Sequence, residues 1–191
     1  MKKILLSLLL AVSTLLFANE INENFDNSEI ILSETGKVLE VTFDNSGKSY
    51  NVELFKLDEK SNSILDFDVT EDALMVNFKD YKQGAYILTI DAEFKSEEVL
   101  IFVGDATVKI IDRRVIHKPV YQFKVKNFKV IVRENQAPID VVFESLSGNI
   151  LHKEKYTSED LNNTVFRLNE AVVVCLNYNG KNYTETIDLV Q

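Results

Sequence analysis

The sequence predicts an all-β protein in which a signal peptide precedes two tandem immunoglobulin-like antiparallel β-sandwich modules. Three observations predict this fold class. One pattern of apolar residues occurs twice, apolar and polar residues alternate along short segments, and these segments follow one another too closely for crossover helices. The expected boundaries are residues 1–18 for the signal peptide, 19–107 for module 1 and 108–191 for module 2.

The internal repeat is the strongest of these observations. Residues 37–57 match residues 126–146 at a fixed shift of 89 positions and without a gap. After three residues are dropped from the following turn, residues 86–103 match residues 172–189. Apolar residues coincide at every second position, which two copies of one sandwich would produce. A single larger sandwich or barrel built from both copies is the competing arrangement.

The first 18 residues predict a secretory signal peptide. Lys2 and Lys3 supply the charged start, residues 4–17 supply the apolar core, and Ala18 is a small residue before the cleavage site. The apolar core is shorter than the roughly 20 residues that a membrane-spanning helix needs, and a retained anchor is the alternative. We expect cleavage after Ala18, no transmembrane anchor in the mature chain, and a secreted or periplasmic location.

Short strands and polar turns are expected throughout both modules. The Asn179-Gly180 pair predicts a tight hairpin turn, because both residues tolerate a positive φ. Residues 157–161 could form one helical turn, and residues 108–111 either close module 1 or enter module 2. The strands expected in module 1 are residues 38–43, 50–57, 64–69, 74–78, 85–91 and 99–103.

The stretch 78–103 resembles a known group of sandwich modules. It contains Gly84-Ala85-Tyr86 and ends in a strongly apolar strand. These features resemble the Gly-x-Tyr strand and closing strand of immunoglobulin-like modules in secreted Bacteroidota proteins, which are relatives of the C-terminal sorting domains of type IX secretion. The resemblance spans residues 38–103, and a weaker copy spans 128–190, where Glu170-Ala171-Val172 replaces Gly-x-Tyr. It implies a sandwich in which the glycine ends a turn and the tyrosine starts a core strand.

Charge distinguishes the two copies. Residues 19–104 carry 19 acidic and 7 basic side chains, a net of −12, whereas residues 105–191 carry 11 acidic and 12 basic side chains, a net of +1. Basic residues crowd the stretch 109–133, and such a field attracts anionic partners. The alternatives are a solvated face or a stretch that neutralises module 1. The residues chosen as a contact patch for an acidic cell-envelope protein or glycan are Arg113, Arg114, Lys118, Lys124 and Lys126.

Two further expectations concern this basic stretch. Alternation along residues 123–126 places Lys124 and Lys126 together on the face opposite Phe123, where we expect both to be exposed. Nucleic acid is not an expected partner, because the sequence pI is about 4.8 and no recognition helix accompanies the basic residues.

Other reactive residues form no recognised catalytic or metal-binding pattern. Cys175 is the single cysteine, so we expect no internal disulfide and a small buried side chain, with a dimerising or catalytic thiol as the alternative. His117 and His152 are the only histidines, and no metal-ligand spacing or nucleophile motif accompanies them. The acidic residues 66–72 could attract calcium, but a solvated acidic strand edge is the preferred interpretation, and no ligands are assigned.

These observations favour a non-catalytic protein that acts by binding or assembly at the bacterial cell envelope, with no cofactor. An undetected hydrolase or enzyme subunit is the alternative, and it would need a pocket that joins His117 or His152 to carboxylates. Cargo or an accessory protein of type IX secretion is a further alternative.

Overall fold

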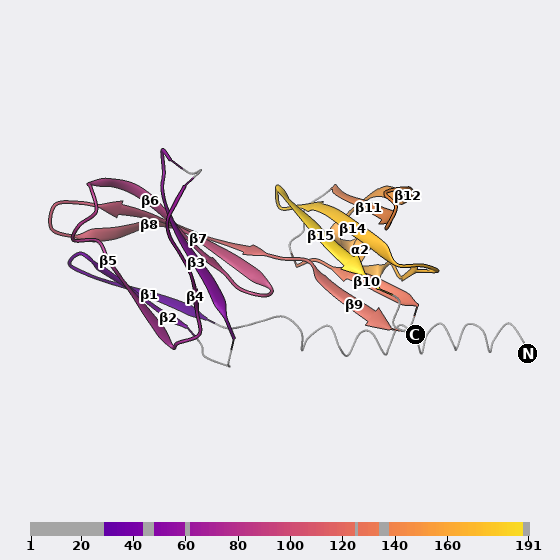
Figure 1. The fold of residues 1–191 in the computed structure, drawn as a ribbon, viewed down its shortest axis with the longest axis horizontal. Coiled ribbons are helices and arrows are strands. Elements are labelled where there is room, and N and C mark those ends of the chain that lie inside the picture. Colours follow the sequence, from indigo (N-terminus) through magenta and orange to yellow (C-terminus); the bar gives the residue numbers. More distant parts are fainter. Residues whose placement is uncertain (1–28, 44–47, 60–61, 125, 134–137, 189–191) are drawn as a thin grey trace, which may run out of the picture. The chain divides into compact units, whose positions relative to one another are not determined.

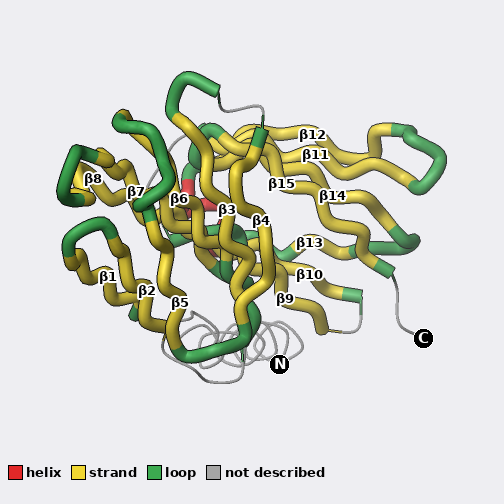
Figure 2. Tube along the Cα trace, turned by 60° about the vertical axis from the view of Figure 1, so that its left-hand side comes forward, coloured by secondary structure: helices red, strands yellow, loops and turns green. Residues whose placement is uncertain are grey.

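The computed structural model describes residues 29–43, 48–59, 62–124, 126–133 and 138–188. These residues form two compact units, one ending at Arg114 and one beginning at Val115, which we call module 1 and module 2 from here on. Figure 1 follows the chain from the indigo strands of module 1 to the yellow strands of module 2. Strands dominate both modules (Figure 2), so the all-β prediction is confirmed.

Module 1 is a sandwich of two sheets whose described pairings are antiparallel. Its strands are β1 (Ile30–Thr35), β2 (Val38–Phe43), β3 (Tyr50–Lys56), β4 (Ser63–Val69), β5 (Ala73–Asn77), β6 (Gly84–Asp91), β7 (Lys95–Val103) and β8 (Val108–His117). One sheet has the order β1-β2-β5, and the other has the order β4-β3-β6-β7-β8. Alternate residues point inward and form one core, in which Val41, Leu54 and Ile101 are fully buried.

Module 2 is a second antiparallel sandwich with its own core. Its elements are β9 (Val120–Lys124), β10 (Asn127–Ile131), β11 (Ile139–Ser145), β12 (Ile150–Tyr156), α2 (Ser158–Asn163), β13 (Phe166–Arg167), β14 (Val172–Tyr178) and β15 (Lys181–Ile187). One sheet has the order β13-β10-β9, and the other has the order β12-β11-β14-β15. Phe128, Val141 and Val174 are fully buried between them.

The two modules share one strand order. In each, the first, second and fifth strands form one sheet, while the fourth, third, sixth and seventh form the other. This arrangement of a split, antiparallel sandwich is immunoglobulin-like. The two cores have no residue in common, so the predicted tandem of sandwiches is confirmed and the single larger sandwich or barrel is wrong.

The repeat also extends to strand register. Pairing between β3 and β4 shifts by one residue between Leu54 and Phe55, where the chain forms a β-bulge. Pairing between β11 and β12 shifts between Phe143 and Glu144, which lie 89 positions later. The sequence alignment therefore matches equivalent residues even at an irregularity of the sheet.

The local predictions for module 2 agree with the structure. Asn179 and Gly180 have φ angles of +54° and +70° and form the two-residue turn between β14 and β15. The expected helical turn is α2, and the Thr157 side chain accepts a hydrogen bond from the backbone N–H of Asp160 at 3.1 Å. Such a cap satisfies an N–H group that has no partner inside the helix.

Strand β8 settles the alternatives for residues 108–111. It lies beside β7 in the sheet of module 1, and the backbone N–H of Val108 donates to the Gly36 carbonyl at 2.7 Å. This segment therefore closes module 1, and the division between the compact units falls within β8, beyond the predicted residue 107.

The predicted signal peptide and its cleavage site lie outside the described residues. Within the described ranges, no helix has the length and apolar character needed to cross a membrane.

Candidate functional site

Arg113, a predicted patch residue, is exposed, but an ion pair and a hydrogen bond hold its side chain against module 1. Its Nε donates to the Glu97 carboxylate at 2.7 Å, and its Nη2 donates to the Ile30 carbonyl at 2.7 Å. Glu97 is only 1% exposed and also meets the Lys95 ammonium at 3.2 Å. Because Arg113 is on β8 and Ile30 is on β1, this side chain connects the two sheets of the sandwich. For Arg113 the geometry matches the alternative in which the basic stretch neutralises acidic groups of module 1.

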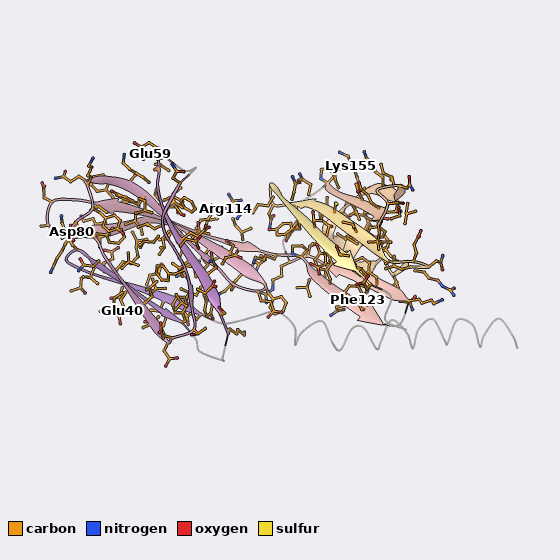
Figure 3. All side chains as sticks on the ribbon, in the orientation of Figure 1. Glu40, Glu59, Asp80, Arg114, Phe123 and Lys155 are labelled. Atoms are coloured by element: carbon orange, nitrogen blue, oxygen red, sulfur yellow. The ribbon has the colours of Figure 1, made fainter. Side chains whose placement is uncertain are left out.

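The remaining patch residues do not lie together in one module. Arg114 is exposed at the end of module 1, where Figure 3 labels it, whereas Lys118, Lys124 and Lys126 belong to module 2. Lys126 occupies the turn between β9 and β10, because Lys124 pairs directly with Asn127. Strand alternation does not apply to a turn residue, so it no longer places Lys126 on the face of Lys124, and the joint exposure of the two side chains stays a prediction. The contact patch itself stays a prediction.

Cys175 lies on the outer face of its sheet, since its neighbours Val174 and Leu176 point into the core. Its side chain is half-buried, and the Thr184 hydroxyl donates to its sulfur at 3.9 Å. The thiol is therefore less enclosed than expected.

Two carboxylates of the acidic edge strand β4 are hydrogen-bonded to the neighbouring strand β3. Asp66 and Asp68 both accept from the Asn51 side-chain amide, at 3.2 and 3.3 Å. Across the described residues, no group of three or more His, Cys, Asp or Glu side chains is arranged to hold a metal ion.

A cavity of about 320 Å³ opens at one end of the module 2 sandwich. Its apolar walls come from both sheets: Phe143 belongs to β11, Phe166 to β13 and Val172 to β14. The Phe143 and Phe166 rings meet edge to face with centroids 4.7 Å apart, and His152 meets Phe166 in the same manner at 5.5 Å. Edge-to-face packing fixes ring orientation, so these side chains make a preformed aromatic wall.

A chain of hydrogen bonds fixes the histidine of this wall. The Tyr156 hydroxyl donates to the Glu154 carboxylate at 2.8 Å and lies 3.1 Å from His152 Nε2. Burial raises the pKa of Tyr156 to about 12, and the hydrogen bond to Glu154 adds to the effect. The phenol therefore stays neutral at physiological pH.

The mouth of the cavity is polar and charged. It is formed by the exposed residues Arg167, Asn169 and Glu170, which precede β14. Leu151, from β12, also lines the cavity and is 48% exposed. The lining is therefore mixed, with apolar and aromatic walls and polar groups at the mouth, and a hollow of about 320 Å³ is within the size range of small binding pockets.

The same end of module 1 can be compared with this end of module 2, because backbone hydrogen bonds identify equivalent residues. The backbone N–H of Leu168 donates to the Lys126 carbonyl at 2.9 Å, as that of Phe78 does to the Lys37 carbonyl at 2.8 Å. Lys37 and Lys126 are equivalent in the repeat, so Leu168 takes the place of Phe78.

Val172, the next core residue of module 2, can also be matched to a residue of module 1 through the residue that it faces on the neighbouring strand. Val172 faces Ile187 across β14 and β15, as Tyr86 faces Ile101 across β6 and β7. The shift is 86 positions for both residues, so Val172 takes the place of Tyr86.

Module 1 fills this place with its own aromatic rings. Ring centroids of Phe78, Tyr81 and Tyr86 lie between 5.1 and 6.1 Å apart, and the Tyr86 hydroxyl donates to the Lys82 carbonyl at 2.8 Å. The last contact is the tyrosine corner of immunoglobulin-like sandwiches. Another hollow of module 1, of about 360 Å³, is lined by Lys56, Asp58 and neighbouring residues, none of which belongs to the core.

Module 2 lacks the groups that fill this end of module 1. Seven residues separate Phe78 from Tyr86, but only three separate Leu168 from Val172, so the shorter loop has no counterpart of Tyr81. Leu168 and Val172, the smaller replacements, both line the cavity.

The cavity was not predicted from the sequence, although the repeat pairs Tyr86 with Val172. The change from a large to a small residue beside a shortened loop was the available signal. Of the residues named as candidates or departures from sequence, His152, Glu170 and Val172 contribute to the lining. The His117 carbonyl instead accepts from the Asn179 amide, at 3.4 Å.

No protein-family model matches the chain, and no curated protein matches it either. Among solved structures, the chain is similar to a two-domain fibronectin type-III segment from chicken tenascin. The two are 10% identical, the match covers 85% of this chain and 99% of that one, and the TM-score is 0.23. A likeness at this level carries no argument about function, and the fold assignment rests on the strand order of each module.

Proposed function

We propose that this chain is a non-catalytic, secreted or periplasmic protein of the bacterial cell envelope that acts by binding, and that the cavity of module 2 is its binding site. The observation that carries the proposal is the contrast between the copies. One strand order positions the same end of both sandwiches. Module 1 fills the core there with tyrosines and keeps only a hollow without core residues in its lining, whereas the hollow of module 2 reaches core residues. The wall residues Phe143 and Phe166 are buried and pack against each other from opposite sheets, which suits a preformed site.

The composition of the cavity supports recognition more than catalysis. Five of its lining residues are Phe143, Leu151, Phe166, Leu168 and Val172, whose side chains offer shape and apolar surface. Charged groups stand only at the mouth, where they can orient a ligand while remaining solvated. The proposed location rests on the predicted signal peptide.

The proposal is tested by affinity capture of binding partners, in which the unmodified chain is compared with a variant whose cavity is filled. Residues 19–191 and the Val172→Tyr variant are immobilised and exposed to an envelope extract of the source cells. We expect a stoichiometric partner to be retained by the unmodified chain and lost by Val172→Tyr. The matched control is Thr186→Tyr, which adds the same side chain at an exposed strand position outside the cavity. Equal retention by all three chains, or no retained partner, would contradict the proposal.

An enzymatic function has one specific observation in its favour. The cavity joins His152 to the carboxylate of Glu170, which is the kind of pocket that this alternative requires. A water-activating histidine would have to work there without a lining serine, threonine or cysteine. The test is a panel of chromogenic esters and glycosides. Turnover that is lost in the His152→Gln variant would support a hydrolase, and no turnover of any compound would count against one.

Type IX secretion is the third proposal, and it rests on the resemblance of residues 38–103. A sorting role requires the C-terminal module. Deleting residues 115–191 should then block export of module 1 in a type IX host, whereas undiminished export would remove this proposal.

A further inference from the structure

We propose that the cavity of module 2 receives a tyrosine side chain presented by a partner polypeptide, so that the partner supplies the ring that module 1 supplies for itself. This inference rests on the proposed binding function and specifies its ligand. The first argument is the repeat: at the matched position module 1 holds Tyr86, whereas module 2 holds Val172.

The lining of the cavity suits an aromatic ring. In module 1, Tyr86 packs against Phe78 and Tyr81 in edge-to-face and tilted arrangements. Module 2 presents Phe143, Phe166 and His152 around the open space, and they already contact one another in such arrangements. An inserted ring would find both ring faces and ring edges, which favours an aromatic group over an aliphatic one of equal volume.

The polar mouth of the cavity suits the peptide backbone that would carry the inserted ring. The Tyr86 hydroxyl donates to the Lys82 carbonyl, which lies in the loop before β6. The shorter loop of module 2 places Asn169 and Glu170 at the cavity instead, and both carry side-chain oxygens that accept hydrogen bonds. A ring that enters from outside leaves the N–H groups of its own backbone at this mouth, where these oxygens can accept from them.

The strand beside the cavity favours a polypeptide as the carrier of the ring. β12 is the outermost strand of its sheet, and its outward N–H and C=O groups have no neighbouring strand among the described residues. Leu151 lines the cavity, and the adjacent Ile150 is 60% exposed. An extended partner segment can pair with such an edge, cover these apolar side chains and direct one of its own into the pocket.

The ring proposal is tested with N-acetyl-tyrosinamide as the probe and N-acetyl-leucinamide as the control. Both are titrated into isotope-labelled chain 19–191, and methyl signals of Leu151, Leu168 and Val172 are followed by NMR. We expect saturable shifts of these methyl groups with the tyrosine probe and at least tenfold weaker binding of the leucine probe. Equal binding of the two probes, or no saturable shift, would overturn the proposal.

Two filled variants show whether the probe enters the cavity. Val172→Tyr and Leu168→Phe introduce the residues that module 1 has at the matched positions, Tyr86 and Phe78. Each substitution should weaken binding of the tyrosine probe at least tenfold. Thr186→Tyr should bind it as the unmodified chain does. Two variants are used because one of them could fail to fold, and their dispersed NMR spectra report folding directly. Undiminished binding by a folded, filled variant would exclude the cavity as the site.

This experiment separates the two proposals. If a partner is captured and lost in Val172→Tyr while the tyrosine probe does not bind, the cavity is a binding site with another ligand, and the tyrosine proposal is overturned alone. Probe binding without any captured partner would support the chemistry of the pocket and overturn the proposed envelope function.

Discussion

Glu97 and Arg113 form an ion pair at 2.7 Å although only 1% of Glu97 is exposed. The two residues lie 16 positions apart on neighbouring strands, and the same guanidinium reaches the Ile30 carbonyl of the opposite sheet. A buried carboxylate needs such partners, because an unpaired charge in a protein interior is strongly destabilising.

We expect Arg113→Ala to lower the free energy of unfolding by about 2–3 kcal/mol, because Glu97 would keep only Lys95 as an ionic partner. Urea denaturation measures the change. The matched control is Arg114→Ala, whose exposed side chain should contribute within about 0.5 kcal/mol. Equal stability of the two variants would show that the ion pair contributes nothing.

The exposed basic residues can be tested separately from this structural arginine. Replacing Arg114 and Lys126 with glutamate should leave the denaturation midpoint nearly unchanged, since both side chains are exposed. If these residues attract anionic partners, the double variant should elute from a poly-glutamate column at lower salt than the unmodified chain. Identical elution would remove the contact patch as a functional surface.

Gly84 offers a test of backbone conformation. It begins β6 with a φ of +146°, a value that residues with a Cβ rarely adopt, although no atom lies within 4 Å of a Cβ placed there. Gly84→Ala should therefore destabilise module 1 by about 1–2 kcal/mol through strain alone. Thermal denaturation measures this, and an unchanged midpoint would show that the turn relaxes without cost.

Tyr156 predicts a specific response to alkaline pH. Its pKa is raised to about 12, above the ordinary value near 10, so the folded state holds this proton more tightly than the unfolded state. The resulting stability is complete below pH 10 and is lost as pH rises towards 12. Tyr156→Phe should therefore lose less stability than the unmodified chain between pH 10 and 12, as followed by urea denaturation at each pH. Parallel losses would contradict the shift.

Periodicity was sufficient to predict most of the fold. Inward positions such as Tyr50 and Val52, and their counterparts Ile139 and Val141, are buried because alternation and burial have the same period in a half-buried strand. β1 was not predicted, because it has little such contrast: only Ile30 is buried, while Ile31 is exposed.

The sites were harder to predict, because they depend on residues brought together from separate strands. Arg113 looked like one of several surface cations until strand pairing placed it beside Glu97. The cavity results from a smaller side chain at Val172 together with a shorter preceding loop, and neither changes the apolar pattern. Hydrophobic periodicity indicates that a side chain is buried but not how much volume that side chain occupies.

Each core is drawn from one continuous part of the chain. The residues of the first core lie between Ile30 and Val108, and those of the second lie between Phe128 and Ile187. A polypeptide that emerges with its N-terminus first can therefore complete the first sandwich before the second has been synthesised. Strands that resemble one another across the two copies then need not be unpaired at the same time, which limits exchange between them.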